Sequence, residues 1–141
     1  MTPAAEVVAA ARAYIDVPFR HQGRTRKEGL DCAGLVIRVA HDLGLTKFDI
    51  RGYKRLPDDD ALAALCDEHL VRTFGFHAGG VARIRMQGDV RPRHLAIMAE
   101  QAYGPSIIHS AWQFGKVVEH RLDDETRRRI VARYLIPGVE Y

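Results

Sequence analysis

The spacing of apolar residues changes at Gly79-Gly80, and this change limits the possible folds more than any other feature of the sequence. Before it, apolar residues recur every three or four positions, which is the helical period. After it, short runs alternate between apolar and polar residues, as strands do. Helical segments followed by strand segments predict an α+β fold, with N-terminal helices packed on an antiparallel sheet.

Three helices are expected in the first half of the chain. The first begins at Thr2-Pro3, with the Thr2 hydroxyl as N-cap and Pro3 as the first helical residue. The second runs from about Asp31 to Leu43 and ends at Gly44, a common stop for a helix. The third follows the acidic residues 58–60, whose charges suit the positive end of a helix dipole. We read the segments between these helices as loops.

Five short strands and one short helix are expected after Gly79-Gly80. Glycine-containing turns separate the runs, and this regular punctuation is typical of an antiparallel meander. The expected strands are residues 81–86, 94–100, 106–112, 116–121 and 132–136. A charged helix at about residues 123–130 is expected before the last strand.

Length and charge set broader limits. The 141 residues suit one domain over residues 1–141, large enough to bury a core without disulfide support. No run reaches the roughly 18 apolar residues of a membrane span, and the N-terminus lacks the features of a secretory signal. A net charge of +3 is too small to identify an anionic partner. We therefore expect no nucleic-acid partner, no membrane insertion and synthesis in the cytoplasm.

A cysteine lies where the second helix is expected to begin, in the segment Leu30–Val36. The positive end of a helix dipole favours a thiolate, so we expect a lowered pKa for Cys32. The small residues Ala33 and Gly34 leave its sulfur accessible. Cys66, in contrast, lies on an apolar helix stripe and is expected in the core. Two cysteines without a signal peptide favour free thiols over a disulfide.

Two histidines lie in expected strands, at His94 and His109. If these strands are neighbours, His109 can hold the His94 ring by a hydrogen bond, which is the base-and-orienter arrangement of a catalytic triad. Cys32 would then be a nucleophile toward an amide. No role is expected for four histidines in helical or exposed polar settings, namely His41, His69, His77 and His120.

Two other kinds of site are disfavoured. Zinc ligands usually occur as close pairs, whereas Cys32, His94 and His109 lie far apart in the sequence. Gly79-Gly80 lacks the following lysine and hydroxyl residue of a phosphate-binding loop. We therefore expect neither a metal nor another cofactor.

These segments resemble the NlpC-type cell-wall cysteine peptidases, a papain-like family, and in particular the branch encoded among bacteriophage tail genes. The matching segments, which fall within roughly residues 5–137, are Pro18–Arg24, Asp31–Val36, Gly79–Val81, His94–Ile97 and Ile108–Ser110. Three positions depart from the family pattern. Ala33 replaces a serine, Phe19 a tyrosine, and Gly80 the aspartate of a Gly-Asp pair.

The resemblance implies a papain-like fold with about five strands and a catalytic set of Cys32, His94 and His109. It implies that the substrate is the peptide stem of peptidoglycan, usually cut between the γ-carboxyl of D-glutamate and a diamino acid. It also implies substrate contacts from Phe19, His21, Gln22 and Asp31, although Asp31 is equally suited to capping the helix alone. A phage-tail or prophage context would bring phage tail proteins as partners and place the activity at the cell wall.

Two alternatives remain open from the sequence. One is a phage tail assembly protein that keeps the fold with little activity. The other is a thiol acyltransferase or deacylase, since related folds perform that chemistry on lipids.

Overall fold

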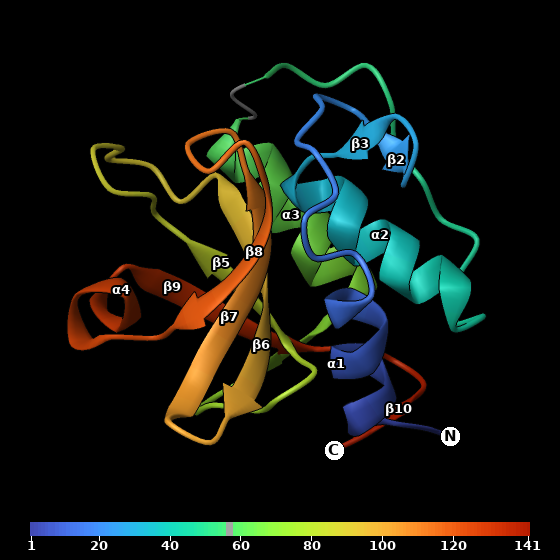
Figure 1. Cartoon of the computed structure of the whole chain (residues 1–141), viewed down its shortest axis with the longest axis vertical. Helices are drawn as coiled ribbons and strands as arrows, with labels where there is room; N and C mark the ends of the chain where they lie inside the picture. Colours follow the sequence, from blue (N-terminus) through green and yellow to red (C-terminus); the bar gives the residue numbers. More distant parts are fainter. Residues whose placement is uncertain (56–57) are drawn as a thin grey trace.

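The computed structural model describes residues 1–55 and 58–141, which form a six-stranded antiparallel sheet with helices on both faces (Figure 1). The strand order is β4-β9-β5-β6-β7-β8. Their bounds are Val71–Thr73 for β4, Val81–Ile84 for β5, His94–Gln101 for β6, Gly104–Ala111 for β7, Lys116–Arg121 for β8 and Ile130–Leu135 for β9. The predicted meander is confirmed by the successive pairing of β5 to β8. The sixth strand, β4, is a three-residue edge strand with no alternating pattern long enough to predict it.

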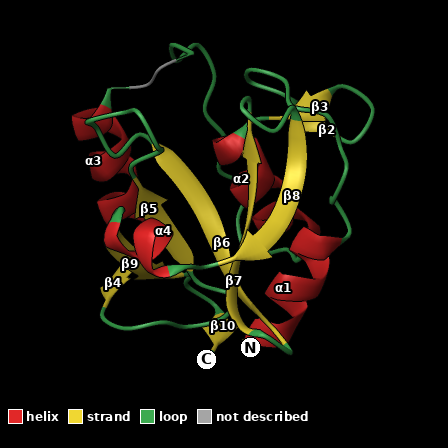
Figure 2. Ribbon diagram, turned by 60° about the vertical axis from the view of Figure 1, so that its left-hand side comes forward, coloured by secondary structure: helices red, strands yellow, loops and turns green. Residues whose placement is uncertain are grey.

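Three helices cover one face of the sheet, and a short one lies on the other side (Figures 1 and 2). The three are α1 (Ala4–Arg12), α2 (Cys32–Asp42) and α3 (Asp59–His69), and the short one is α4 (Asp124–Arg128). The main core lies between α1, α2, α3 and the sheet, where Val7, Leu35 and Ile97 are fully or almost fully buried. A smaller apolar cluster, with Ile84 and Ile107, lies on the opposite face.

The first helix starts one residue later than the sequence predicts. Thr2 and Pro3 form β1, which pairs in parallel with β10 (Val139–Glu140), and the Thr2 N–H donates to the Gly138 carbonyl at 3.0 Å. Pro3 is the N-cap and makes no side-chain capping bond. The predicted Thr2 cap is therefore wrong, because the extended pairing of the two termini holds Thr2 outside the helix.

The second helix is confirmed, with its predicted cap. The Asp31 side chain accepts a hydrogen bond from the Gly34 N–H at 2.7 Å, which satisfies one of the free donors of the first turn. The helix ends before Gly44, whose φ of 68° is a left-handed conformation that glycine adopts without steric cost. The acidic start of α3 is confirmed as well, since the Asp58 carboxylate caps its first turn.

The segment that leads into α2 is held to the sheet and to a neighbouring loop. A small hairpin, β2 (Arg24–Thr25) with β3 (Gly29–Leu30), precedes the helix. The Leu30 N–H donates to the Pro18 carbonyl at 2.9 Å, and the Ser110 hydroxyl donates to the Leu30 carbonyl at 2.6 Å. Leu30 is fully buried. The first residues of α2 therefore have a fixed position relative to β7.

Gly34 lets that loop approach the helix. A Cβ at this position would lie 2.3 Å from the Gly23 carbonyl oxygen and 2.9 Å from an Arg24 guanidinium nitrogen. Both distances are far below van der Waals contact, and the nearer atom is backbone. The first turn of α2 therefore requires a glycine for steric reasons.

We predict that Gly34→Ala lowers the free energy of unfolding by about 3 kcal/mol, because overpacking must displace the loop backbone. Gly44→Ala is the matched control: nothing lies within 4 Å of its Cβ, so only the positive φ costs energy, about 1 kcal/mol. Urea unfolding of the two variants measures the difference. Equal losses would show that the Gly23 contact is relieved without cost.

Candidate active site

Cys32 is the first residue of α2, and its sulfur lies beside the start of β6. The backbone N–H of Leu95, the residue after His94, is hydrogen-bonded to the thiol. Cys32 is half-buried and Cys66 is buried, and both are free thiols, as predicted. No hydrogen bond joins Cys32 to His94 within residues 1–55 and 58–141.

The two histidines predicted to act together are in contact. His94 Nε2 lies 2.7 Å from His109 Nδ1, and their rings meet edge to face with centroids 4.9 Å apart. Both side chains are buried. They come from adjacent strands, β6 and β7, on the same face of the sheet. The predicted hydrogen bond between His94 and His109 is therefore present in the fold.

A third histidine extends this pair, and the sequence interpretation missed it. His120, on β8, places Nε2 at 2.8 Å from His109 Nε2, and its Nδ1 lies 3.0 Å from the Arg121 carbonyl. The sequence analysis expected no role for His120, and the structure shows it hydrogen-bonded to His109. Its partner is eleven residues away on the neighbouring strand, and only the register of β7 with β8 brings them together. An alternating strand pattern through residue 120 was the one available signal.

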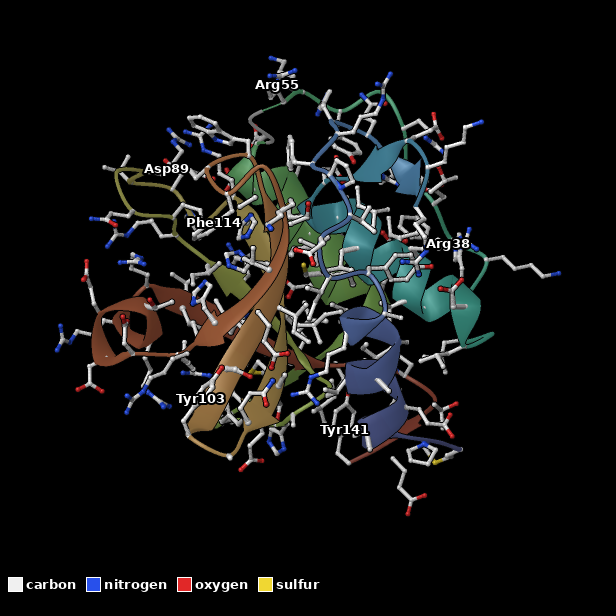
Figure 3. All side chains as sticks on the ribbon, in the orientation of Figure 1. Arg38, Arg55, Asp89, Tyr103, Phe114 and Tyr141 are labelled. Atoms are coloured by element: carbon white, nitrogen blue, oxygen red, sulfur yellow. The ribbon has the colours of Figure 1, made fainter. Side chains whose placement is uncertain are left out.

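Phe114 covers the outer part of this chain of histidines. It belongs to the turn between β7 and β8, and Figure 3 labels it there. Its ring contacts His109 at a centroid distance of 5.5 Å and His120 at 5.6 Å. Aromatic cover of this kind limits the access of water to the imidazole pair.

Burial opposes charge on both Cys32 and His94. It raises the pKa of the Cys32 thiol to about 12, and the adjacent Asp31 carboxylate also raises it, outweighing the backbone N–H groups that favour the thiolate. It lowers the pKa of His94 to about 4. The pKa of His109 is well below its usual value because of burial and the neighbouring histidine charges. The predicted lowering of the Cys32 pKa is therefore wrong: enclosure by the fold outweighs the helix terminus.

Asp31 is saturated by hydrogen bonds from the protein itself. One carboxylate oxygen accepts from the Gly34 N–H and from Arg24, at 2.7 and 3.2 Å. The other accepts from the Gln22 N–H at 2.7 Å and from the Tyr53 hydroxyl. Four donors fill the acceptor sites of a carboxylate. This arrangement favours the helix-capping role of Asp31 over the binding of a substrate amine.

Arg24 is the cation that compensates this buried carboxylate. Its side chain is only 6% exposed, and it also donates to Asp49 at 2.9 Å and to the Ile50 carbonyl at 3.0 Å. A further donation from Arg24, to the Tyr53 hydroxyl at 2.9 Å, closes a network around Asp31. The sequence interpretation did not single out Arg24, although this residue ends the matching segment Pro18–Arg24. It did not single out Tyr53 either, which lies in no recognisable motif.

The other proposed substrate contacts divide into two places. His21 and Gln22 both donate to the Tyr53 carbonyl, at 3.1 and 2.9 Å, and so hold the loop that carries Tyr53 against the start of α2. Phe19 lies elsewhere: its N–H donates to the Gly115 carbonyl at 2.9 Å, at the turn between β7 and β8. His21 and Gln22 therefore join the Asp31 network, whereas Phe19 lies between the β7–β8 turn and β3, where it forms a bridge with Leu30.

Gly80 has a structural explanation for its departure from the family pattern. A Cβ there would lie 2.7 Å from the Tyr134 carbonyl oxygen and 2.8 Å from the Met98 side chain. An aspartate has no room at this position, so the residue before β5 is a glycine packed against β9.

None of the helices within residues 1–55 and 58–141 is long and apolar enough to cross a bilayer. In the same residues, no three histidine, cysteine, aspartate or glutamate side chains are grouped so as to hold a metal ion.

Comparison with solved structures identifies the fold. The chain aligns over 98% of its length with an NLP/P60-family protein similar to lipoprotein from Staphylococcus aureus, with a TM-score of 0.64 and 14% identity, and it covers 42% of that chain. It aligns over 96% of its length with the NlpC/p60 domain of the peptidoglycan hydrolase SagA, with a TM-score of 0.60 and 21% identity, and covers all of that domain.

An N-acetylmuramoyl-L-alanine amidase from Bacteroides uniformis is also similar, with a TM-score of 0.55 and 12% identity over 93% of this chain and 96% of the amidase. No family model matches the sequence, and no curated protein does. At these identities the likeness establishes the fold, which is that of an NlpC/P60 domain.

We predict that Cys32 is a neutral thiol in the free protein. Since burial raises its pKa, deprotonation is delayed to strongly alkaline pH, so the ultraviolet absorbance of thiolate should show no step between about pH 5 and pH 9. Cys32→Ser provides the baseline, because the remaining Cys66 also has a pKa raised by burial, to about 11. A step near neutral pH that Cys32→Ser removes would instead indicate a resting thiolate–imidazolium pair.

Proposed function

We propose that this protein is a cysteine peptidase that hydrolyses an amide bond in the peptide stem of peptidoglycan. The observation that carries the proposal is the hydrogen bond of 2.7 Å between His94 and His109, at the end of the sheet where Cys32 begins α2. The names of similar structures, a peptidoglycan hydrolase and an N-acetylmuramoyl-L-alanine amidase, support cell-wall substrates.

The mechanism follows from the neutral resting state of the site. His94 removes the thiol proton as the Cys32 sulfur attacks the carbonyl carbon. The charged thiolate and imidazolium therefore form only when substrate is bound and reacting. The backbone N–H of Cys32 and a second donor stabilise the oxyanion. His94 then protonates the leaving amine, and water, activated by the same imidazole, hydrolyses the thioester. His109 holds the His94 ring throughout.

The bond and the biological context form the finer part of this proposal. We propose that the protein cleaves the bond between the γ-carboxyl of D-glutamate and the diamino acid. We also propose that a phage tail delivers the protein to the cell wall. Both rest on the sequence resemblance. Mass spectrometry of released fragments identifies the bond, and tail genes on both sides of the coding sequence would support the context.

We predict that purified peptidoglycan incubated with the protein gains free amino groups, and that Cys32→Ser abolishes the gain. His94→Ala should lose roughly 10²- to 10⁴-fold in rate, the usual contribution of a general base. His109→Gln should retain more activity than His109→Ala, because the amide can still accept from the His94 ring. A folded parent protein that releases no amino groups would favour the alternative of a phage tail assembly protein.

A second candidate function, thiol acyl transfer or deacylation, is favoured by one observation. An apolar cavity of about 220 Å³ lies along α2, lined by Ala33, Val36, Ile37 and Ala40 on the helix and by Leu95 on β6. Ala33 and Leu95 are the chain neighbours of Cys32 and His94, although neither catalytic residue lines the cavity. An apolar acyl chain has the chemistry to occupy such a space.

Short-chain and medium-chain acyl esters test this candidate. If the cavity binds acyl groups, kcat/KM for an octanoyl ester should exceed that for an acetyl ester. Ala40→Leu, which adds bulk within the cavity, should reduce that preference. Equal rates for the two esters, unaffected by Ala40→Leu, would exclude the acyl function.

A further inference from the structure

Three histidines from three adjacent strands form one continuous chain of hydrogen bonds. His94 on β6 contacts His109 on β7, which contacts His120 on β8, at 2.7 and 2.8 Å. The outer end of the chain is the Arg121 carbonyl, 3.0 Å from His120 Nδ1. The inner end is His94 Nδ1, the ring nitrogen that does not contact another histidine of the chain.

The carbonyl at the outer end determines which nitrogens carry protons. A carbonyl oxygen only accepts, so His120 Nδ1 carries a proton and donates it to Arg121. In a neutral imidazole the other nitrogen is then an acceptor, so His109 Nε2–H donates to His120 Nε2. By the same rule His109 Nδ1 accepts, and His94 Nε2–H donates to it.

The rule leaves His94 Nδ1 with a free lone pair. In the reverse arrangement, with every donor and acceptor exchanged, His94 Nδ1 would carry a proton and could not act as a base. Three neutral rings allow only these two arrangements, and burial favours the neutral form of His94 and His109 because it lowers the pKa of each. Only the outermost contact, between His120 and Arg121, distinguishes them.

We propose that His120 is a positioning residue that sets the tautomers of His109 and His94, and thereby keeps the Nδ1 of His94 unprotonated as the base for Cys32. The tautomer assignment stands on the hydrogen bonds between neutral rings, whereas its catalytic meaning rests on the proposed function. His120 touches neither Cys32 nor any reacting atom, and acts only through His109.

Two substitutions at position 120 separate hydrogen-bond direction from packing. His120→Glu supplies an acceptor to His109 Nε2–H and should preserve the arrangement. His120→Lys supplies only donors, so it should force a proton onto His109 Nδ1 and then onto His94 Nδ1. Both side chains are flexible and polar, and residue 120 is only half-buried. Both variants lose the packing of the imidazole against Phe114 equally.

The first measurement is the ¹⁵N NMR spectrum of the histidine rings, which identifies the protonated nitrogen of each ring without any substrate. We expect His94 to carry its proton on Nε2 in the parent protein and in His120→Glu, and on Nδ1 in His120→Lys. A proton on His94 Nδ1 in the parent, or the same tautomer in both variants, would overturn the proposal.

The second measurement is the steady-state rate with peptidoglycan fragments. His120→Lys should lower kcat roughly 100-fold with little change in KM, because it removes general-base catalysis rather than binding. His120→Glu should keep kcat within a few-fold of the parent. Equal kcat losses in both variants would mean that the imidazole is needed for packing, and would contradict the proposal. If the tautomers respond as expected and even the parent cleaves nothing, the proposed function fails and the tautomer assignment stands.

Discussion

The buried ion pair between Arg24 and Asp31 is the interaction on which the candidate site depends. Asp31 caps α2, and its second oxygen binds the backbone of Gln22 and the Tyr53 hydroxyl, so one carboxylate positions both the helix and the adjoining loop. Removing one partner of such a pair leaves an uncompensated buried charge, which typically costs 3–5 kcal/mol. The pair therefore acts through geometry: it determines where Cys32 lies, at the first turn of α2.

The histidines of the candidate site are brought together by the register of the sheet, because they lie far apart in the sequence. Antiparallel pairing of β6, β7 and β8 places His94, His109 and His120 on one face, in a row across three strands. The helices pack on the opposite face, so Cys32 reaches the row only at the end of the sheet, where β6 begins. This location explains why the thiol contacts the Leu95 backbone N–H rather than a strand interior.

Local features were predictable because their causes are local. The cap of α2, its end at Gly44 and the meander from β5 to β8 all follow from residues within a few positions of each element. The pairing of His94 with His109 followed from placing two strands side by side. The N-terminal helix start was mispredicted because Thr2 pairs with β10, at the far end of the chain, and no nearby residue indicates that contact.

The sequence by itself determined the fold class, the placement of Cys32 at a helix start and the two histidines on neighbouring strands, since these depend on periodicity and capping. Only the tertiary structure decided the protonation chemistry. Burial raises the pKa of Cys32, whereas a helix N-terminus would lower it. Burial lowers the pKa of His94, whereas a neighbouring thiolate would raise it. Burial in turn depends on what the whole fold packs around these two residues. The role of His120 was likewise decided by strand register, because a hydrogen bond between strands depends on a spatial neighbour that sequence spacing does not specify.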